Sequence, residues 1–295
     1  MDGEEMIGMI ERTLVAGGTV TKHVSPEYYE AAAAIAQPRH FPSPVNDPVW
    51  INSATDWFVE SETAMEVGSG RGEFAEAVVA KAGGLNRYYI VDMSQGMLNL
   101  VKRRIRTVKT GVEPVFICSD VDTDSLSEIP DHSLDRIIMN NAFQDINPLA
   151  ALRTFRRVLK PTGLFRANII DREIREKYST EDDFFDREMG YFYLTRHPPN
   201  EGGEEIEPIG YVTRGDCEKT PFYRMMRSYY RSELEEIFNE CGFEIVSDAP
   251  LILPKEIWMN SAAAQGRGKT RRLELMDKSG RYQSSIEIIA KPVTN

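Results

Sequence analysis

Ala64-Met65-Glu66-Val67-Gly68-Ser69-Gly70-Arg71-Gly72-Glu73-Phe74 decides the fold of this chain. An apolar strand runs into a turn with glycine at alternate positions, and the spacing predicts a helix from Phe74 to Lys81. Glycine lets the backbone turn tightly and approach a ligand closely, and a helix that begins there directs its free N–H groups at that ligand. A second predicted strand, Tyr88–Val91, ends in Asp92, whose carboxylate can accept both hydroxyls of a ribose. Together these features predict a site for a nucleoside cofactor.

The spacing of the glycines indicates which cofactor is expected. A dinucleotide-binding turn requires G-x-G-x-x-G, but Glu73 occupies the third glycine position and the third glycine is Gly72. Glu66 lies two residues before the first glycine, where it would repel a pyrophosphate and favour a sulfonium or an ammonium group. Both departures argue against a nicotinamide oxidoreductase.

The glycine pattern resembles motif I of the class I S-adenosylmethionine-dependent methyltransferases. Further segments resemble the later motifs of that family in the same order, although Thr162 replaces the first of the two glycines that usually follow the proline. These segments are Asp92–Leu98, Ser119–Val121, Ile129–Asp135, Arg136–Asn141 and Phe155–Gly163.

The resemblance implies S-adenosyl-L-methionine as cofactor and suggests a role for each matching residue. The glycine turn would approach the methionine portion, Asp92 would bind the ribose, and Asp120 would meet the adenine amino group. Met93 and Val121 would enclose the adenine, and one of the two asparagines would bind the methionine ammonium. The expected cofactor-binding residues are Glu66, Gly68, Ser69, Gly70, Asp92, Met93, Met97, Asp120, Val121, Asn140 and Asn141.

Strands alternating with helices predict an α/β fold with a doubly wound, mostly parallel sheet. The family resemblance implies seven strands with the last one antiparallel. We expect an N-terminal helical cap at 1–60, a Rossmann-like core at 61–171, an inserted substrate lid at 172–230 and the rest of the core at 231–295. The cap would contain helices at 6–15, from 25 onward and at 50–59, and it could instead serve only to cover an edge of the sheet.

The predicted lid is rich in aromatic residues and contains seven of the twelve tyrosines. These rings predict a wall for an organic substrate, although most could form a small core of the lid itself. His197 and Tyr223 are the candidate catalytic residues, but no general base can be identified from the sequence. Transfer to a carbon or sulfur nucleophile needs little help with deprotonation, so this does not argue against catalysis.

Composition limits the classes of partner. The 295 residues include 46 acidic and 35 basic side chains, with a net charge of −11, which argues against a broad nucleic-acid-binding face. Three widely spaced cysteines indicate reduced thiols, and no apolar run is long enough for a membrane span. We therefore expect a soluble, cytoplasmic protein without a metal centre, and one that could form a homo-oligomer by exchanging its cap.

The leading hypothesis is a methyltransferase of the small-molecule or natural-product type, which acts in secondary metabolism by in-line methyl transfer to a small organic substrate of aromatic or apolar, quinone-like character. The alternatives are a protein or RNA methyltransferase and a protein of this fold that binds the cofactor without methylating. The motifs cover about a third of the chain and report the cofactor rather than the substrate, because fold alone does not establish function.

Overall fold

The computed structural model describes most of the chain from residue 47 onward. The described residues are 44, 47–174 without 82 and 109–110, 222–294 without 258 and 260–282, and the short strands at 19–21, 184–185 and 191–195. The helices predicted at 6–15 and from residue 25 lie outside this part of the chain.

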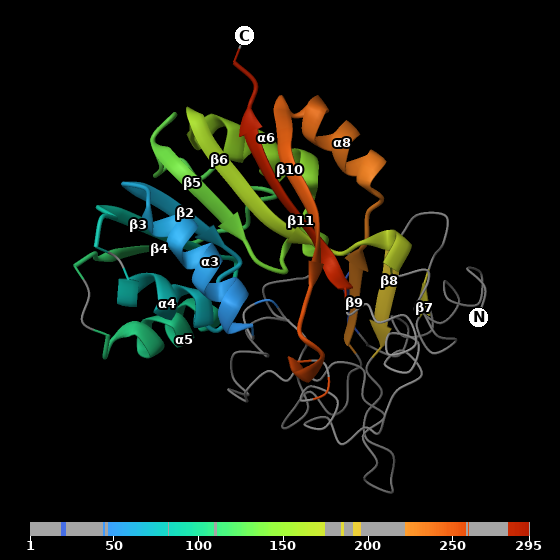
Figure 1. Ribbon diagram of the computed structural model, residues 1–295, viewed down its shortest axis with the longest axis horizontal. Helices are drawn as coiled ribbons and strands as arrows, with labels where there is room; N and C mark the ends of the chain where they lie inside the picture. The colour runs from blue at the N-terminus through green and yellow to red at the C-terminus, as the bar shows by residue number, and fades with distance from the viewer. Residues whose placement is uncertain are drawn as a thin grey trace, which may run out of the picture.

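A seven-stranded sheet in the order β10-β11-β6-β5-β2-β3-β4 forms the centre of the molecule (Figure 1). Its first five strands in the chain are parallel, and β11 runs antiparallel to both of its neighbours. The prediction of a doubly wound sheet with an antiparallel last strand is confirmed. The strands are β2 Thr63–Val67, β3 Arg87–Asp92, β4 Pro114–Cys118, β5 Leu134–Met139, β6 Leu159–Ile169, β10 Phe243–Ile252 and β11 Gln283–Pro292.

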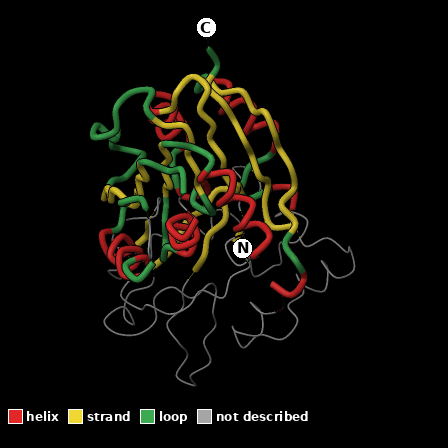
Figure 2. Tube along the Cα trace, turned by 60° about the vertical axis from the view of Figure 1, so that its left-hand side comes forward, coloured by secondary structure: helices red, strands yellow, loops and turns green. Residues whose placement is uncertain are grey.

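Helices cover both faces of this sheet (Figures 1 and 2). One apolar cluster joins the sheet to α3, α4 and α5, and a second joins it to α6 and α8. Alternate side chains of β2 serve the two clusters, with Ala64 in the first and Met65 and Val67 in the second. The helices are α3 Pro48–Val59, α4 Glu73–Lys81, α5 Gln95–Ile105, α6 Pro148–Val158 and α8 Arg231–Glu240.

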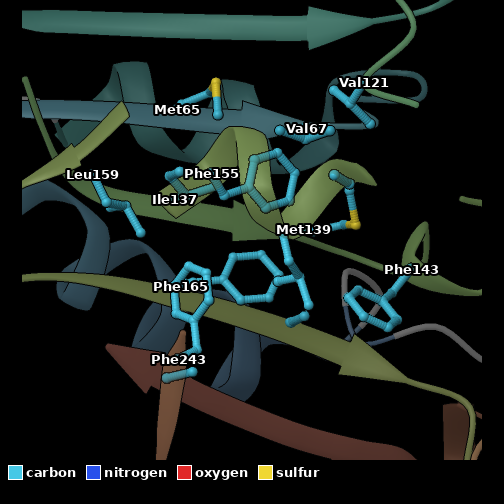
Figure 3. Packing of buried hydrophobic residues seen from close by; sticks show 14 of the residues in the cluster. Met65, Val67, Val121, Ile137, Met139, Phe143, Phe155, Leu159, Phe165 and Phe243 are labelled. Atoms are coloured by element: carbon cyan, nitrogen blue, oxygen red, sulfur yellow. The ribbon is translucent and has the colours of Figure 1, made fainter. Parts of the chain in front are cut away.

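The second cluster is dominated by aromatic rings (Figure 3). Phe165 on β6 packs against Phe155 of α6 with ring centroids 5.3 Å apart, and against Phe143 at 6.3 Å. Phe143 belongs to the short 3-10 helix η2 (Phe143–Asp145), which follows the end of β5. Burial of these rings therefore fixes the segment that leaves β5 at the predicted cofactor edge.

Helix α3 confirms the predicted helix at 50–59 and is held to the sheet by a polar cluster. The Arg166 guanidinium of β6 lies over the rings of Trp50 and Trp57, at 5.6 and 5.5 Å from their centroids. Glu287 of β11 accepts hydrogen bonds from Arg166 Nη2 at 2.8 Å and from Trp50 Nε1 at 2.7 Å. The pairing of Arg166 with a carboxylate and two aromatic faces explains how a buried guanidinium is tolerated.

Two strand boundaries differ from the predictions. β6 begins at Leu159, directly after α6, whereas the sequence predicted a turn up to Gly163. The turn residues form an irregularity inside the strand, because Leu134 pairs with Leu159 while Arg136 pairs with Leu164. β10 extends to Ile252 instead of ending at residue 246, since β11 continues to pair with it.

The predicted lid contributes a second sheet that the sequence did not indicate. Its order is β1-β9-β8-β7, with β7 Phe184–Phe185, β8 Tyr191–Thr195 and β9 Phe222–Arg227. β1 (Thr19–Thr21) comes from the predicted cap and pairs parallel with β9. The insert closes on itself where Tyr229 N donates to Ile170 O at 3.0 Å, so it leaves and rejoins the core at one point beside the end of β6.

Candidate functional site

The site is built at the carboxyl ends of β2 and β5, where the chain switches from winding one way across the sheet to winding the other. This is the edge at which open α/β sheets bind their ligands. Gly68 begins the turn after β2 with φ +71°, and its N–H donates to Val91 O of β3 at 2.9 Å. A Cβ at this position would lie 2.6 Å from the Cβ of Ala142, so only glycine fits between the two strand exits.

Asp92 holds the glycine turn in place. Its Oδ2 accepts from the Gly70 N–H at 3.1 Å and lies 3.4 Å from Ser69 Oγ, while its Oδ1 accepts from the Ser94 N–H at 3.0 Å. The side chain is 6% exposed and lies at the end of β3. The carboxylate therefore lies at the position predicted for a ribose ligand, and it also orders the turn and the start of α5.

The remainder of the turn is fixed from the side of α5. Arg104 Nε donates to Arg71 O at 3.0 Å, and its guanidinium pairs with Glu73 and Glu76 in the first turn of α4. Gly72 has φ +84°, and a Cβ there would meet Val101 at 3.0 Å. The turn is consequently closely packed against α5. The opposite side of the turn, where a ligand would bind, is formed by backbone groups.

Glu66 is 2% exposed and accepts a hydrogen bond from the hydroxyl of Tyr88 on the neighbouring strand. The pKa of Glu66 is raised to about 8, chiefly by burial and to a smaller extent by the negative charges of Asp92 and Glu73, against the lowering effect of the Tyr88 hydroxyl. Burial and the same carboxyl group also raise the pKa of Tyr88 well above its ordinary value. Glu66 is therefore protonated at pH 7 in this structure.

The residues predicted around the adenine lie at the ends of β3 and β4. Met93 is half-buried beside Asp92, whereas Met97 and Val121 are buried at 1% and 5% exposure. Asp120 is half-buried, and its Oδ1 accepts from the Asp122 N–H at 3.0 Å. The structure therefore places these side chains at one edge of the sheet and engages Asp120 in a turn.

The predicted ammonium-binding residues follow β5. Asn141 adopts φ +51°, and its carbonyl accepts from the Gln144 side chain. Asn140 Oδ1 accepts from Asn168 Nδ2 of β6 at 3.4 Å. Neither Asn140 Nδ2 nor Asn168 Oδ1 has a hydrogen-bond partner, and both atoms are buried. The same holds for Gln144 Oε1.

The side chains of the two candidate catalytic residues lie outside the described part of the structure. His197 lies outside the described residues, and Tyr223 is placed by its backbone alone, in β9. His132, which we expected to be exposed, is exposed, and its Nδ1 lies 3.0 Å from Leu159 O. Within the described ranges, no group of three or more His, Cys, Asp or Glu side chains is arranged to hold a metal ion.

Sequence reasoning missed two residues of the site. Tyr88 was assigned only to a strand, but the pairing of Ala64 with Tyr88 and of Glu66 with Ile90 places its hydroxyl on the face of Glu66. Asn168 was assigned to the predicted fifth strand, and an amide in an otherwise apolar strand end was the available signal. Both depend on register between strands, which a motif search does not supply.

The comparisons with known proteins agree with this geometry. Residues 65–167 match the family model Methyltransf_11, described as a methyltransferase domain. No curated protein matches the sequence at a significant level.

Several solved structures share the fold at low sequence identity. The CcbJ methyltransferase from Streptomyces caelestis is 16% identical with a TM-score of 0.55, and the match covers 90% of this chain and 98% of that one. A S-adenosylmethionine-dependent methyltransferase from Clostridium acetobutylicum is 15% identical with a TM-score of 0.53, covering 83% and 91%. A putative methyltransferase of Haloferax volcanii, in complex with the Trm112 methyltransferase activator, is 14% identical with a TM-score of 0.53, covering 91% and 96%.

No helix in the described part of the chain combines the length and apolar character that a membrane crossing requires. The glycine turn, the carboxylate at the end of β3 and the domain match at 65–167 all point to one cofactor. Together with the fold, they support a methyltransferase that uses S-adenosylmethionine.

Proposed function

We propose that this protein transfers a methyl group from S-adenosylmethionine to a small organic substrate. The observation that carries the proposal is the pair of hydrogen bonds that the buried Asp92 carboxylate accepts from the Gly70 and Ser94 N–H groups. These bonds join the glycine turn to the start of α5 at the edge of the sheet where β2 and β5 end. A site built this way is present before any ligand arrives, which is typical of cofactor sites.

The residues present fit this cofactor. Glycine at position 68 lets the turn after β2 pack directly against Ala142, which brings the exits of β2 and β5 together at the proposed cofactor site. Asp92, at the end of β3, supplies a buried carboxylate that can accept the hydroxyls of a ribose. S-adenosylmethionine supplies, when bound, a methyl group activated by its sulfonium charge.

The protein's own contribution is to bind, orient and exclude water. The turn from Gly68 to Gly70 and the strand-end residue Asp92 would fix the position of the cofactor. Much of the rate enhancement of a displacement can arise from such positioning. Glu66, protonated and paired with Tyr88, adds no negative charge beside the turn at neutral pH, so that it does not stabilise a cationic ligand too strongly before reaction.

A small substrate is supported by the charge of the chain and by the position of the insert. With a net charge of −11 the protein lacks the general basic character of nucleic-acid-binding proteins. The insert leaves and rejoins the core at Asp171 and Tyr229, beside the end of β6, and could therefore cover a ligand at this edge. His197 and Tyr223 in this insert remain candidates for contact with the substrate, and exchange of the cap between subunits remains a possible route to a homo-oligomer.

Calorimetric titration with S-adenosylmethionine, S-adenosylhomocysteine and NADH tests the proposal. We expect micromolar binding of the two adenosyl ligands, no binding of NADH, and an affinity about 10- to 100-fold lower in Asp92→Asn, because a hydrogen bond to a charged group is lost. Asp248→Asn, an exposed carboxylate on β10, serves as the matched control. Binding of NADH alone, or equal affinities for the Asp92 and Asp248 variants, would refute the proposal.

A further inference from the structure

Two side-chain amides at the carboxyl edge of the sheet each have one buried atom without a hydrogen-bond partner. Asn168 is 1% exposed and Asn140 is half-buried, and Asn168 Nδ2 donates to Asn140 Oδ1 at 3.4 Å. Asn168 Oδ1 and Asn140 Nδ2 are both buried and unpaired. A buried polar atom without a partner costs about 1–3 kcal/mol, so folded proteins retain few of them, and a bound group is one of the explanations for those that remain.

This result does not depend on which atom of each amide is oxygen. Exchanging the nitrogen and oxygen of both side chains preserves one hydrogen bond between them and again leaves one N–H donor and one C=O acceptor unpaired. Exchanging only one would place two like atoms in contact. The pair therefore offers one donor and one acceptor to a third group in every reasonable assignment.

The position of the pair relates it to the proposed cofactor site. Val67 of β2 pairs with Met139, and Met139 pairs with Ala167 of β6, so the next residues along the strands are Gly68, Asn140 and Asn168 in adjacent strands. Neighbouring strands lie about 4.8 Å apart. Asn168 is consequently two strands from the glycine turn, and a group bound by both amides would lie beside the cofactor rather than on it.

We propose that Asn140 and Asn168 together recognise the substrate. They would bind the edge of a substrate molecule that presents a hydrogen-bond donor and an acceptor side by side, as the N–H and C=O of a lactam or carboxamide do. This assignment rests on the proposed function, because it places the substrate next to the bound cofactor. A purely apolar substrate, or one that carries acceptors alone, would leave one of the two amides unpaired. The amide pair thus narrows the substrate class to molecules with a cyclic or open amide edge.

The test uses 2-pyridone, whose edge carries N–H and C=O, and N-methyl-2-pyridone, in which the donor is blocked. Their affinities are measured by ligand-observed NMR on protein saturated with S-adenosylhomocysteine, in wild type and in Asn168→Leu. We expect wild type to bind 2-pyridone about tenfold more tightly than its methylated analogue, and Asn168→Leu to lose this preference. Asn239→Leu, an exposed asparagine on α8, should retain it.

Folding and cofactor binding are checked in the same variants. Leucine is close in size to asparagine; Asn168→Leu removes an unpaired buried carbonyl but also the long hydrogen bond to Asn140, so these opposing effects should leave its melting temperature little changed. If Asn168→Leu fails to fold, Asn168→Met takes its place, because methionine also lacks the amide group and adapts more readily to the available space.

Three results would overturn the inference. One is equal binding of the two pyridones to wild type, and another is binding of neither at millimolar concentration. The third is a weakened affinity of Asn168→Leu for S-adenosylhomocysteine but not for 5′-methylthioadenosine, which would assign the pair to the amino acid portion of the cofactor. Failure of wild type to bind S-adenosylhomocysteine would instead refute the proposed function, so the two failures are distinguishable.

Discussion

Replacing Glu66 by glutamine should change how the stability of the protein depends on pH. The pKa of Glu66 is raised from 4.5 to about 8, chiefly by burial. Because this carboxyl group binds a proton more tightly in the folded state, its contribution to stability is complete below pH 4.5 and is lost as the pH rises toward 8. One pKa unit corresponds to about 1.4 kcal/mol, so the whole loss is on the order of 5 kcal/mol.

Glutamine cannot lose a proton, so Glu66→Gln should not show this loss. Between pH 5 and pH 7, the unfolding free energy of Glu66→Gln should gain roughly 3 kcal/mol relative to wild type. Urea denaturation of both proteins at pH 5, 6 and 7 measures this difference, and Glu113→Gln, an exposed glutamate before β4, provides the baseline. A difference that stays constant over this range would show that Glu66 is ionised in the folded protein and would refute the reasoning.

Two further substitutions test the packing around the site by thermal and urea unfolding. Gly68→Ala should destabilise the protein by about 2 kcal/mol or more, because its Cβ would overlap a neighbouring methyl group at a φ of +71°. Gly83→Ala should have little effect, since its nearest new contact is 3.9 Å away, and an equal loss in both would contradict the argument. Arg166→Met should cost about 3 kcal/mol by leaving its buried carboxylate partner uncompensated. Arg153→Met removes an exposed ion pair and should cost less than about 1 kcal/mol. Similar losses of stability in the two variants would show that burial of the Arg166 ion pair does not increase its contribution.

Much of the large sheet could be predicted because its signals are local. The strand, glycine turn and helix at 64–81 follow from residue types alone, and the structure moves the start of this helix by only one residue, to Glu73. The family resemblance then implied seven strands with the last one antiparallel, and the structure confirms both. Local pattern failed at 159–163, where pairing with β5 continues the strand through a segment containing proline and glycine.

The parts of the site that could not be predicted depend on contacts between distant segments. Asp92 was identified from its place after a strand, but its role in holding the turn depends on the Gly70 N–H that the fold brings within 3.1 Å. The raised pKa of Glu66 depends chiefly on its burial in the folded sheet, and its hydrogen-bond partner Tyr88 comes twenty-two residues later in the chain. The unpaired amides of Asn140 and Asn168 meet only because β5 and β6 are neighbours.

The second sheet has a consequence for the order in which the protein is made and folded. Thr19 of β1 pairs with Phe222 of β9, so β1 leaves the ribosome long before the strand with which it pairs. Contacts so distant in the chain form slowly, because a long loop must close before they contribute. Residues 63–118, whose three strands pair with one another, can associate well before that. The cofactor-binding half of the sheet can therefore form during synthesis, whereas the sheet that joins cap and insert must be completed afterwards.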